Sequence, residues 1–187
     1  MGDSHVNDNI VTDIGQLGAI AMNETIVTIR RAIQTDSNVI WAIFHEVVKK
    51  GDSYTFDPAI SQGEALSYWM GKDKYCYVAE HEGKAVGTYI IKDNQPGLGS
   101  HIANASFMVS PNFQGKSAGR IMGEHAQGEA RRLGYKAMQF NIVISTNIPA
   151  VKLWQKLGFN IIGTIPEAFR HKELGKLVDA YIMHKVL

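Results

Sequence analysis

The chain has 187 residues, of which 45% are hydrophobic and 20% charged, with a formal net charge of +1. A chain of this size and apolar content can bury a full core without disulfides or a structural metal. The near-zero net charge gives no argument for nucleic acid or an anionic membrane as a partner, and no apolar run approaches the roughly 20 residues of a membrane span. The single cysteine, Cys76, excludes an internal disulfide and is typical of a reducing compartment, so we expect a cytoplasmic protein.

The N-terminal half predicts an arm followed by strands and helices. Residues 1–23 are polar and dotted with glycine, so we expect an arm outside a single domain formed by residues 24–187. Hydrophobic periodicity and turn residues then predict two helices between strands. The elements are a strand at Thr25–Ile33, a helix from Thr35 or Asp36 to Lys50 with Val39, Ile43 and Val47 inward, a helix from the capping box Ser61–Glu64 to about Met70, and a hairpin of Tyr75–Glu82 and Ala85–Lys92.

The C-terminal half continues this alternation and ends in two strands. The elements are a strand at Ile102–Val109, a helix from Ala118 to about Leu133, a strand at Lys136–Ser145, a helix from Asn147 to Gly158, a strand at Asn160–Ile165, a loop at Pro166–Leu177 and a strand at Asp179–Val186. This order is typical of an α/β (α+β) architecture with a mixed sheet.

The most informative segment is Ser110–Arg120, which joins a predicted strand to a predicted amphipathic helix. The first turn of a helix has unpaired N–H groups and the positive end of the helix dipole. Gly115 and Gly119 allow an anion to approach the backbone closely, and Lys116 and Arg120 add positive charge. The segment therefore predicts a site for a phosphorylated cofactor.

A nucleotide-hydrolase loop is the first alternative for this segment. Gly115–Ser117 matches the end of a Walker A loop, but that loop needs a glycine where Ser110 stands, followed here by Pro111. The strand at Met138–Ser145 also lacks a carboxylate that would hold Mg²⁺. These departures argue against nucleotide hydrolysis.

The loop instead resembles that of the GNAT acetyltransferase superfamily, in which Gln/Arg-x-x-Gly-x-Gly/Ala follows a strand ending in Val-x-Pro. Val109–Pro111 and Gln114–Arg120 fit this pattern except at Ser117, where a glycine is expected. The segment Asn147–Phe159 is similar to the superfamily's second signature, Asn-x-x-Ala-x-x-Leu-Tyr-x-Lys-x-Gly-Phe. The resemblance spans residues 26–187 and implies a mixed, mostly antiparallel sheet with splayed central strands, flanked by helices.

The resemblance also implies acetyl-CoA as the co-substrate, lying between the two splayed strands. The implied cofactor-binding residues are Met108, Val109, Gln114, Gly115, Lys116, Ser117, Ala118, Gly119, Arg120 and Asn147. An amine would attack the thioester directly in a ternary complex, with the backbone N–H of Val109 stabilising the developing oxyanion. Asn147 would bind the pantetheine arm or place the acetyl group; its alternative role is a helix cap without a ligand contact.

The pattern is incomplete at the acid and the base of the reaction. Trp154 stands where the superfamily's tyrosine protonates the leaving thiolate, and an indole N–H cannot supply a proton at neutral pH. We therefore expect Trp154 to shape the pocket, with Tyr135 and Tyr181 as weaker substitutes for the acid. The general base stays open among three candidates, Glu80, Asp57 and His101.

The C-terminal pattern from Gly158 to Ala180 resembles small-molecule N-acetyltransferases, which include phosphinothricin-type enzymes and fungal enzymes that act on toxic proline analogues. This resemblance places Tyr54, Phe56 and Asn141 at the acceptor side, an arrangement that suits a small amino acid. A protein N-terminus, an aminoglycoside and a CoA-binding regulator without catalysis are the alternatives. The histidines lack metal-ligand spacing, so we expect no metal, and a homodimer is compatible with the resemblance.

Overall fold

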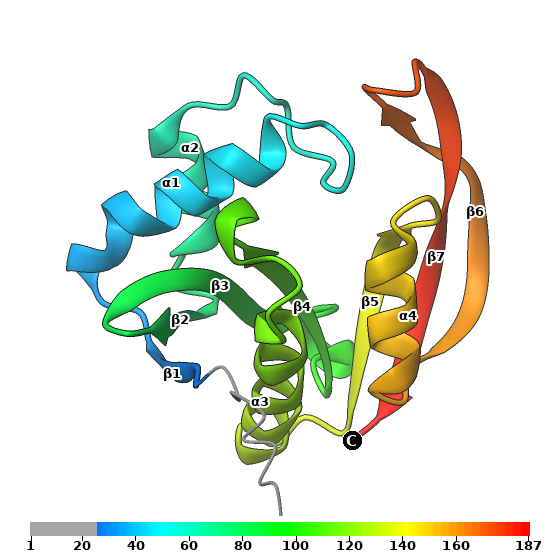
Figure 1. Cartoon of the computed structure of the whole chain (residues 1–187). Helices are drawn as coiled ribbons and strands as arrows, with labels where there is room; N and C mark the ends of the chain where they lie inside the picture. Colours follow the sequence, from blue (N-terminus) through cyan, green and yellow to red (C-terminus); the bar gives the residue numbers. More distant parts are fainter. Residues whose placement is uncertain (1–25) are drawn as a thin grey trace, which may run out of the picture.

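The structure follows the predicted order of elements, with longer strands near the C-terminus. The computed structural model describes residues 26–187, so the predicted arm at 1–23 lies outside the described residues (Figure 1). The elements are β1 (Thr28–Arg31), α1 (Ser37–Val48), α2 (Gln62–Trp69), β2 (Tyr75–His81), β3 (Lys84–Asp93), β4 (Ile102–Val109), α3 (Ala118–Arg132), β5 (Ala137–Ile144), α4 (Ile148–Lys156), β6 (Asn160–His171) and β7 (Lys176–Val186). Within the described part of the chain, no helix is long and apolar enough to cross a membrane.

One sheet with the strand order β1-β2-β3-β4-β5-β7-β6 runs through the molecule. Its pairs are antiparallel except β4 with β5, which pair in parallel only at Ile102–Asn104 with Ala137–Gln139. Beyond these residues the two strands separate, and β5, β7, β6 and α4 stand apart from the first four strands (Figure 1). The expected mixed, mostly antiparallel sheet with splayed central strands is confirmed.

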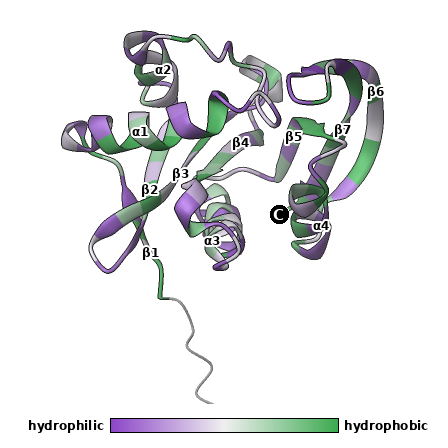
Figure 2. Cartoon of the chain, turned by 45° about the horizontal axis from the view of Figure 1, so that its top comes forward, coloured by the Kyte–Doolittle hydropathy of each residue, from purple (hydrophilic) through white to green (hydrophobic). Residues whose placement is uncertain are grey.

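The helices cover the two faces of the sheet. Because side chains alternate along a strand, Val78 and Ile90 pack against α1 and α2, whereas Tyr77 and Tyr89 lie on the opposite face in the cluster that includes α3 and α4. Figure 2 shows hydrophilic and hydrophobic residues side by side along α1 and α3, as expected of helices with one buried face. The helices on the two faces of the sheet therefore pack against the strands that border the gap between β4 and β5.

Two details of the predicted elements differ in the structure. Val39, Ile43 and Val47 face the core as predicted, but the buried residues of α1 are Ile40, Ile43, Phe44 and Val48, and Val39 and Val47 are half-buried at the edge of the same cluster. Two apolar rows run along this helix, and the row containing Phe44 is buried because its ring packs edge-on against Trp69, with centroids 5.6 Å apart. The predicted loop Pro166–Leu177 is mostly strand. A bulge between Ile165 and Phe169 accommodates the proline on β6, which is an edge strand, and the turn follows His171.

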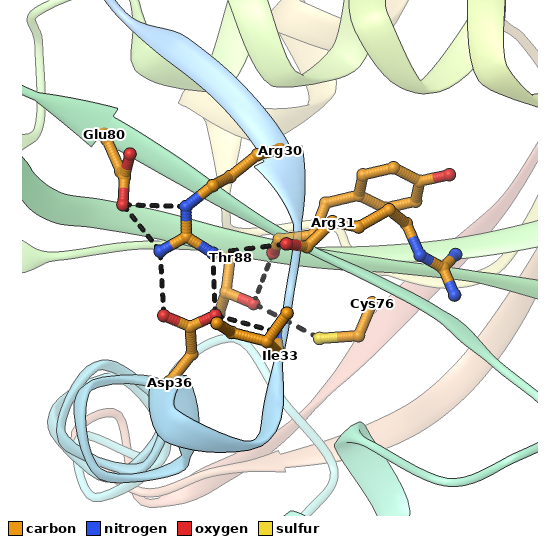
Figure 3. A network of polar contacts seen from close by, with 8 residues as sticks. Arg30, Arg31, Ile33, Asp36, Cys76, Glu80 and Thr88 are labelled. Atoms are coloured by element: carbon orange, nitrogen blue, oxygen red, sulfur yellow. Dashed lines mark hydrogen bonds and ion pairs between the residues drawn. The ribbon is translucent and has the colours of Figure 1, made fainter.

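A charged network fixes β1 to the start of α1 (Figure 3). The Arg30 guanidinium donates to both carboxylate oxygens of Asp36, at 2.7 and 2.8 Å, and to Glu80 of β2 at 2.7 Å. The Ile33 N–H also donates to Asp36, at 2.8 Å. These contacts hold the pKa of Asp36 below its usual value, chiefly through the hydrogen bonds from Arg30. The network occupies Glu80, one of the predicted general bases.

Candidate active site

The predicted phosphate loop has the geometry of an anion site. Gly115 has a φ of +78°, and a Cβ added there would meet no atom within 4 Å, so the loop is open on this side. Helix α3 begins at Ala118, and no acceptor within residues 26–187 receives the N–H groups of the segment Gly115–Arg120. Free N–H groups at the positive end of a helix dipole bind phosphate.

Ser117, the departure from the glycine pattern, lies in the left-handed region with a φ of +62°. It is the residue before α3, but its side chain makes no capping hydrogen bond. The backbone here requires a conformation that glycine adopts without steric cost and other L-residues adopt with strain. This requirement explains why the family pattern has glycine at this position.

Ser117→Gly is expected to raise the free energy of unfolding by up to about 1 kcal/mol, because relief of left-handed strain exceeds the added backbone entropy of glycine. Acetyl-CoA affinity should stay the same or increase, since the loss of Cβ opens the backbone to phosphate. Thermal melts with and without acetyl-CoA measure both effects. Ser117→Ala is the control, because it removes the hydroxyl and keeps the strain. A large loss of affinity in both variants would mean that the hydroxyl itself binds the cofactor.

The register of β4 decides which backbone groups face the gap. The Ser110 N–H donates to the Val86 carbonyl at 2.8 Å, and Met108 lies opposite Thr88. In an antiparallel ladder, every second residue pair exchanges hydrogen bonds, so Met108 pairs with β3. Phe107 and Val109 therefore direct their backbone groups toward β5, as the Val109 oxyanion prediction requires. Met108 is also an implied cofactor-binding residue, but its backbone N–H and carbonyl groups pair with β3 and are not free to bind the cofactor.

The Tyr54 hydroxyl satisfies the backbone of Phe107, which the separation of the strands would otherwise leave unpaired. It donates to the Phe107 carbonyl at 2.5 Å and accepts from the Phe107 N–H at 3.0 Å. Burial raises the pKa of Tyr54, so the group remains a neutral hydroxyl that can do both. The hydroxyl of Tyr54 thus anchors β4 two residues before Val109, while its ring lines the cavity on the predicted acceptor side, so binding of the acceptor by Tyr54 stays a prediction.

Helix α4 places Asn147 and Trp154 along the gap. Asn147 is the residue before the helix, and its side-chain oxygen accepts from the Ala150 N–H at 3.3 Å, so Asn147 caps α4, while its contact with the pantetheine arm or the acetyl group stays a prediction. Trp154 is 8% exposed and packs between Phe107 and Phe140, with ring centroids 4.8 and 4.7 Å away. No hydrogen bond within residues 26–187 uses its indole N–H. Trp154 therefore forms a wall, as expected.

Two cavities meet in the gap between the strands. The cofactor-side cavity, of about 880 Å³, is lined by Met108, Val109 and the loop Gln114–Arg120 without Lys116. The acceptor-side cavity, of about 280 Å³, is lined by Asn104–Phe107 of β4, Phe140–Ile144 of β5 and the segment Ser53–Phe56. Both cavities share the side chains of Ser53, Tyr54, Phe107, Asn147, Ala150 and Trp154.

The remaining predicted site residues divide into those that reach the cavities and those that do not. Phe56 and Asn141 line the acceptor-side cavity as predicted. Lys116 does not line the cofactor-side cavity; its ammonium lies 5.0 Å from the centre of the Phe113 ring. Sequence reasoning missed several lining residues because they come from distant elements. These are Asp52, His171 and Glu173 on the cofactor side and Tyr68, Lys92 and Asn104 on the acceptor side.

The candidates for general acid and base lie away from both cavities. Tyr135 donates to Asp93 at 2.7 Å, and neither Tyr135 nor Tyr181 lines a cavity. Among the candidate bases, Glu80 pairs with Arg30, the Asp57 carboxylate accepts from a nearby backbone N–H, and His101 bonds a carbonyl of its own turn. The described residues also contain no group of three His, Cys, Asp or Glu side chains that could hold a metal.

Comparison with known proteins gives the family. Residues 40–159 match the model of the acetyltransferase (GNAT) family. The chain belongs to the GNAT family. This acetyltransferase is 32% identical over 165 residues to N-acetyltransferase aca1 of Schizosaccharomyces pombe, a match that covers 78% of the chain and 77% of that protein.

Solved structures agree with this assignment. A GCN5-related N-acetyltransferase from Kribbella flavida is 40% identical with a TM-score of 0.81, covering 86% of this chain and 98% of that one. The structure of yncA from Salmonella typhimurium with its cofactor acetyl-CoA is 25% identical with a TM-score of 0.77, covering 87% of this chain and 94% of that one. The GNAT protein is therefore an N-acetyltransferase that uses acetyl-CoA.

The residues present fit acetyl-CoA. The free N–H groups of Gly115–Arg120 suit its pyrophosphate, and the cavity of about 880 Å³ leads from this loop to the Val109 N–H. The wall at Ala150 and Trp154 continues to the smaller cavity, where an acceptor can approach. The GNAT fold thus brings the predicted anion site, the predicted oxyanion donor and a second cavity together in the gap between β4 and β5.

Proposed function

We propose that this enzyme transfers the acetyl group of acetyl-CoA to the primary or secondary amine of a small molecule, an amino acid or an amino-acid analogue. The observation that carries this proposal is the acceptor-side cavity of about 280 Å³, which meets the cofactor-side cavity at Phe107 and Trp154. A cavity near the lower end of the usual volume range of small-molecule sites accommodates an amino acid. The aromatic wall of Tyr54, Phe56 and Tyr68 suits an apolar side chain.

The roles of the site residues follow from their positions. When bound, acetyl-CoA supplies a thioester carbonyl that an amine can attack. The Val109 N–H donates a hydrogen bond to the charge that develops on the carbonyl oxygen, while Tyr54 fixes Phe107, two residues before it on β4. Gln114–Arg120 holds the pyrophosphate, and Trp154 excludes water from the junction of the cavities.

No carboxylate within residues 26–187 lines the acceptor-side cavity, and Asp52 and Glu173 line only the cofactor-side cavity, so the acceptor amine loses its proton to water. Activity should therefore increase with pH toward the pKa of the free acceptor amine.

The pattern at Gly158–Pro166 and Val178–Ala180 supports placing the enzyme with the phosphinothricin and proline-analogue acetyltransferases. Release of free thiol from acetyl-CoA with a panel of amino acids, aminoglycosides and short peptides tests the acceptor class. Turnover with peptides alone would contradict it.

Acetyl-CoA at ~100 times its Kd is expected to stabilise the fold by about 2.7 kcal/mol. Gly119→Glu should abolish this shift, because Gly119 lines the cofactor-side cavity and a carboxylate would repel the pyrophosphate. Gly128→Glu controls for the added charge, since Gly128 is an exposed glycine of the same helix; a Cβ at Gly119 meets the Leu153 side chain at 3.2 Å, whereas one at Gly128 meets no atom within 4 Å, so each variant is compared with its own melt without acetyl-CoA. If acetyl-CoA does not change the melting temperature of the native protein, the loop Gln114–Arg120 is not the pyrophosphate site.

A further inference from the structure

The acceptor-side cavity has one charged side chain in its wall, that of Lys92 at the end of β3. Its other lining residues within the described chain are neutral. Lys92 is half-buried, forms no ion pair with any of residues 26–187, and has its ammonium 5.6 Å from the centre of the Tyr68 ring. Lys74, on the same ring at 4.7 Å, differs because it is paired with Asp73 and lines neither cavity. Lys92 thus lines a binding cavity with no carboxylate of the described residues at ion-pair distance; the charge of Asp73 acts on it, but that carboxylate is already paired with Lys74.

The neutral polar groups around Lys92 are largely engaged with the protein. Asn141 accepts from Gln139 at 2.9 Å and donates to Asn94 at 2.8 Å. Asn104 donates to the Gln139 carbonyl at 2.9 Å, across the last paired residues of β4 and β5. These hydrogen bonds fix the side-chain amides of Asn104 and Asn141 in the wall of the cavity. The strongest unused hydrogen-bond donor in the cavity is the Lys92 ammonium.

We infer that Lys92 binds an anionic group of the acceptor, a carboxylate in the case of an amino acid. This inference rests on the proposed function and names the specificity determinant of its acceptor site. A half-buried ammonium attracts a carboxylate and repels the cationic form of an amine, so it orients a molecule that carries both groups. The carboxylate then lies next to Lys92, and the amine points toward the junction with the cofactor-side cavity, which Val109 lines. The acceptor is therefore an amine that carries its own acid group.

The test compares L-alanine, L-proline and L-methionine with their methyl esters in the native enzyme and in Lys92→Met, Lys92→Arg and Lys74→Met. Lys92→Met is expected to lower kcat/KM for the free amino acids at least thirtyfold, mainly through KM, and to change that of the esters less than threefold. For each substrate, kcat/KM of the variant is divided by kcat/KM of the native enzyme. The lower amine pKa of the esters affects both values equally and does not change this ratio. Lys92→Arg should recover part of the loss, and Lys74→Met should show none.

A second measurement does not depend on turnover. N-acetyl-L-methionine, added together with CoA, is expected to raise the melting temperature of the native protein and of Lys74→Met but not of Lys92→Met. Equal losses for acids and esters, or an unchanged KM in Lys92→Met, would overturn the role of Lys92. If the native enzyme acetylates only amines without an acid group, the role of Lys92 is also overturned, but the proposed acetylation of a small molecule is not. Absence of turnover with every small amine contradicts the proposed function, while the melting experiment still decides whether Lys92 binds a carboxylate.

Discussion

Tyr54→Phe is expected to lower kcat by about tenfold to a hundredfold while the stabilisation by acetyl-CoA is kept. The Tyr54 hydroxyl is the hydrogen-bond partner of both the N–H and the carbonyl of Phe107, two residues before the predicted oxyanion donor. Without it, this part of β4 has no neighbouring strand on the β5 side and can shift. Loss of one oxyanion donor costs about a hundredfold to a thousandfold in kcat, so a displaced donor should cost less.

Tyr135→Phe is the control for this prediction. Its hydroxyl also makes a hydrogen bond, to Asp93 at 2.7 Å, but it lines neither cavity, so kcat should stay within twofold. Steady-state kinetics with both substrates separates the two roles of Tyr54. An increased acceptor KM with an unchanged kcat would mean that the hydroxyl binds the acceptor, as the sequence alone suggests, and that it does not position β4.

The phosphate loop and α4 could be predicted from sequence because their function is local. Glycines, a helix start and a strand end within Ser110–Arg120 determine an anion site without any distant partner. The same reasoning could not find the strain at Ser117, because a serine before a helix is usually a cap. Only the left-handed φ of +62° shows what the glycine of the family pattern is for.

The acceptor side was predicted less well because it is built from segments far apart in the chain. Tyr54 and Phe56 come from the segment between α1 and α2, Lys92 from the end of β3 and Asn141 from β5. No spacing in the sequence shows that these side chains share a cavity. Tyr54 illustrates the consequence: it lines the acceptor-side cavity as predicted, but the contact of its hydroxyl with the Phe107 backbone, 53 residues away, could not be predicted from sequence.

The C-terminal hairpin shows a different limit. Pro166 and Gly175 are strong turn signals, so a loop between them was the natural prediction. An edge strand with a bulge tolerates proline, however, and β6 continues to His171. This longer hairpin brings His171 and Glu173 to the cofactor-side cavity.

Trp154→Ala is expected to destabilise the fold by about 3–5 kcal/mol, the usual cost of deleting a large buried aromatic side chain. Trp154 is 8% exposed and contacts Phe107, Phe140 and Phe159, and a Cβ at Gly123 would lie 3.0 Å from its ring. Helix α3 therefore packs directly under the indole. Thermal or urea unfolding measures this loss in the free energy of unfolding. Acetyl-CoA should also stabilise the variant less than the native protein, because removal of the indole joins the two cavities.

Trp154→Phe separates the packing role from a chemical one. If the indole is only a wall, this variant keeps most of kcat, losing at most one hydrogen bond of about 0.5–1.5 kcal/mol. Trp154→Tyr puts a phenol at the junction of the cavities, and kcat should increase if departure of the thiolate limits the rate. Both variants must be compared at equal stability, since the ring packs against three aromatic side chains. A thousandfold fall of kcat in Trp154→Phe, with melting temperature and acetyl-CoA binding intact, would mean that the indole N–H stabilises the transition state.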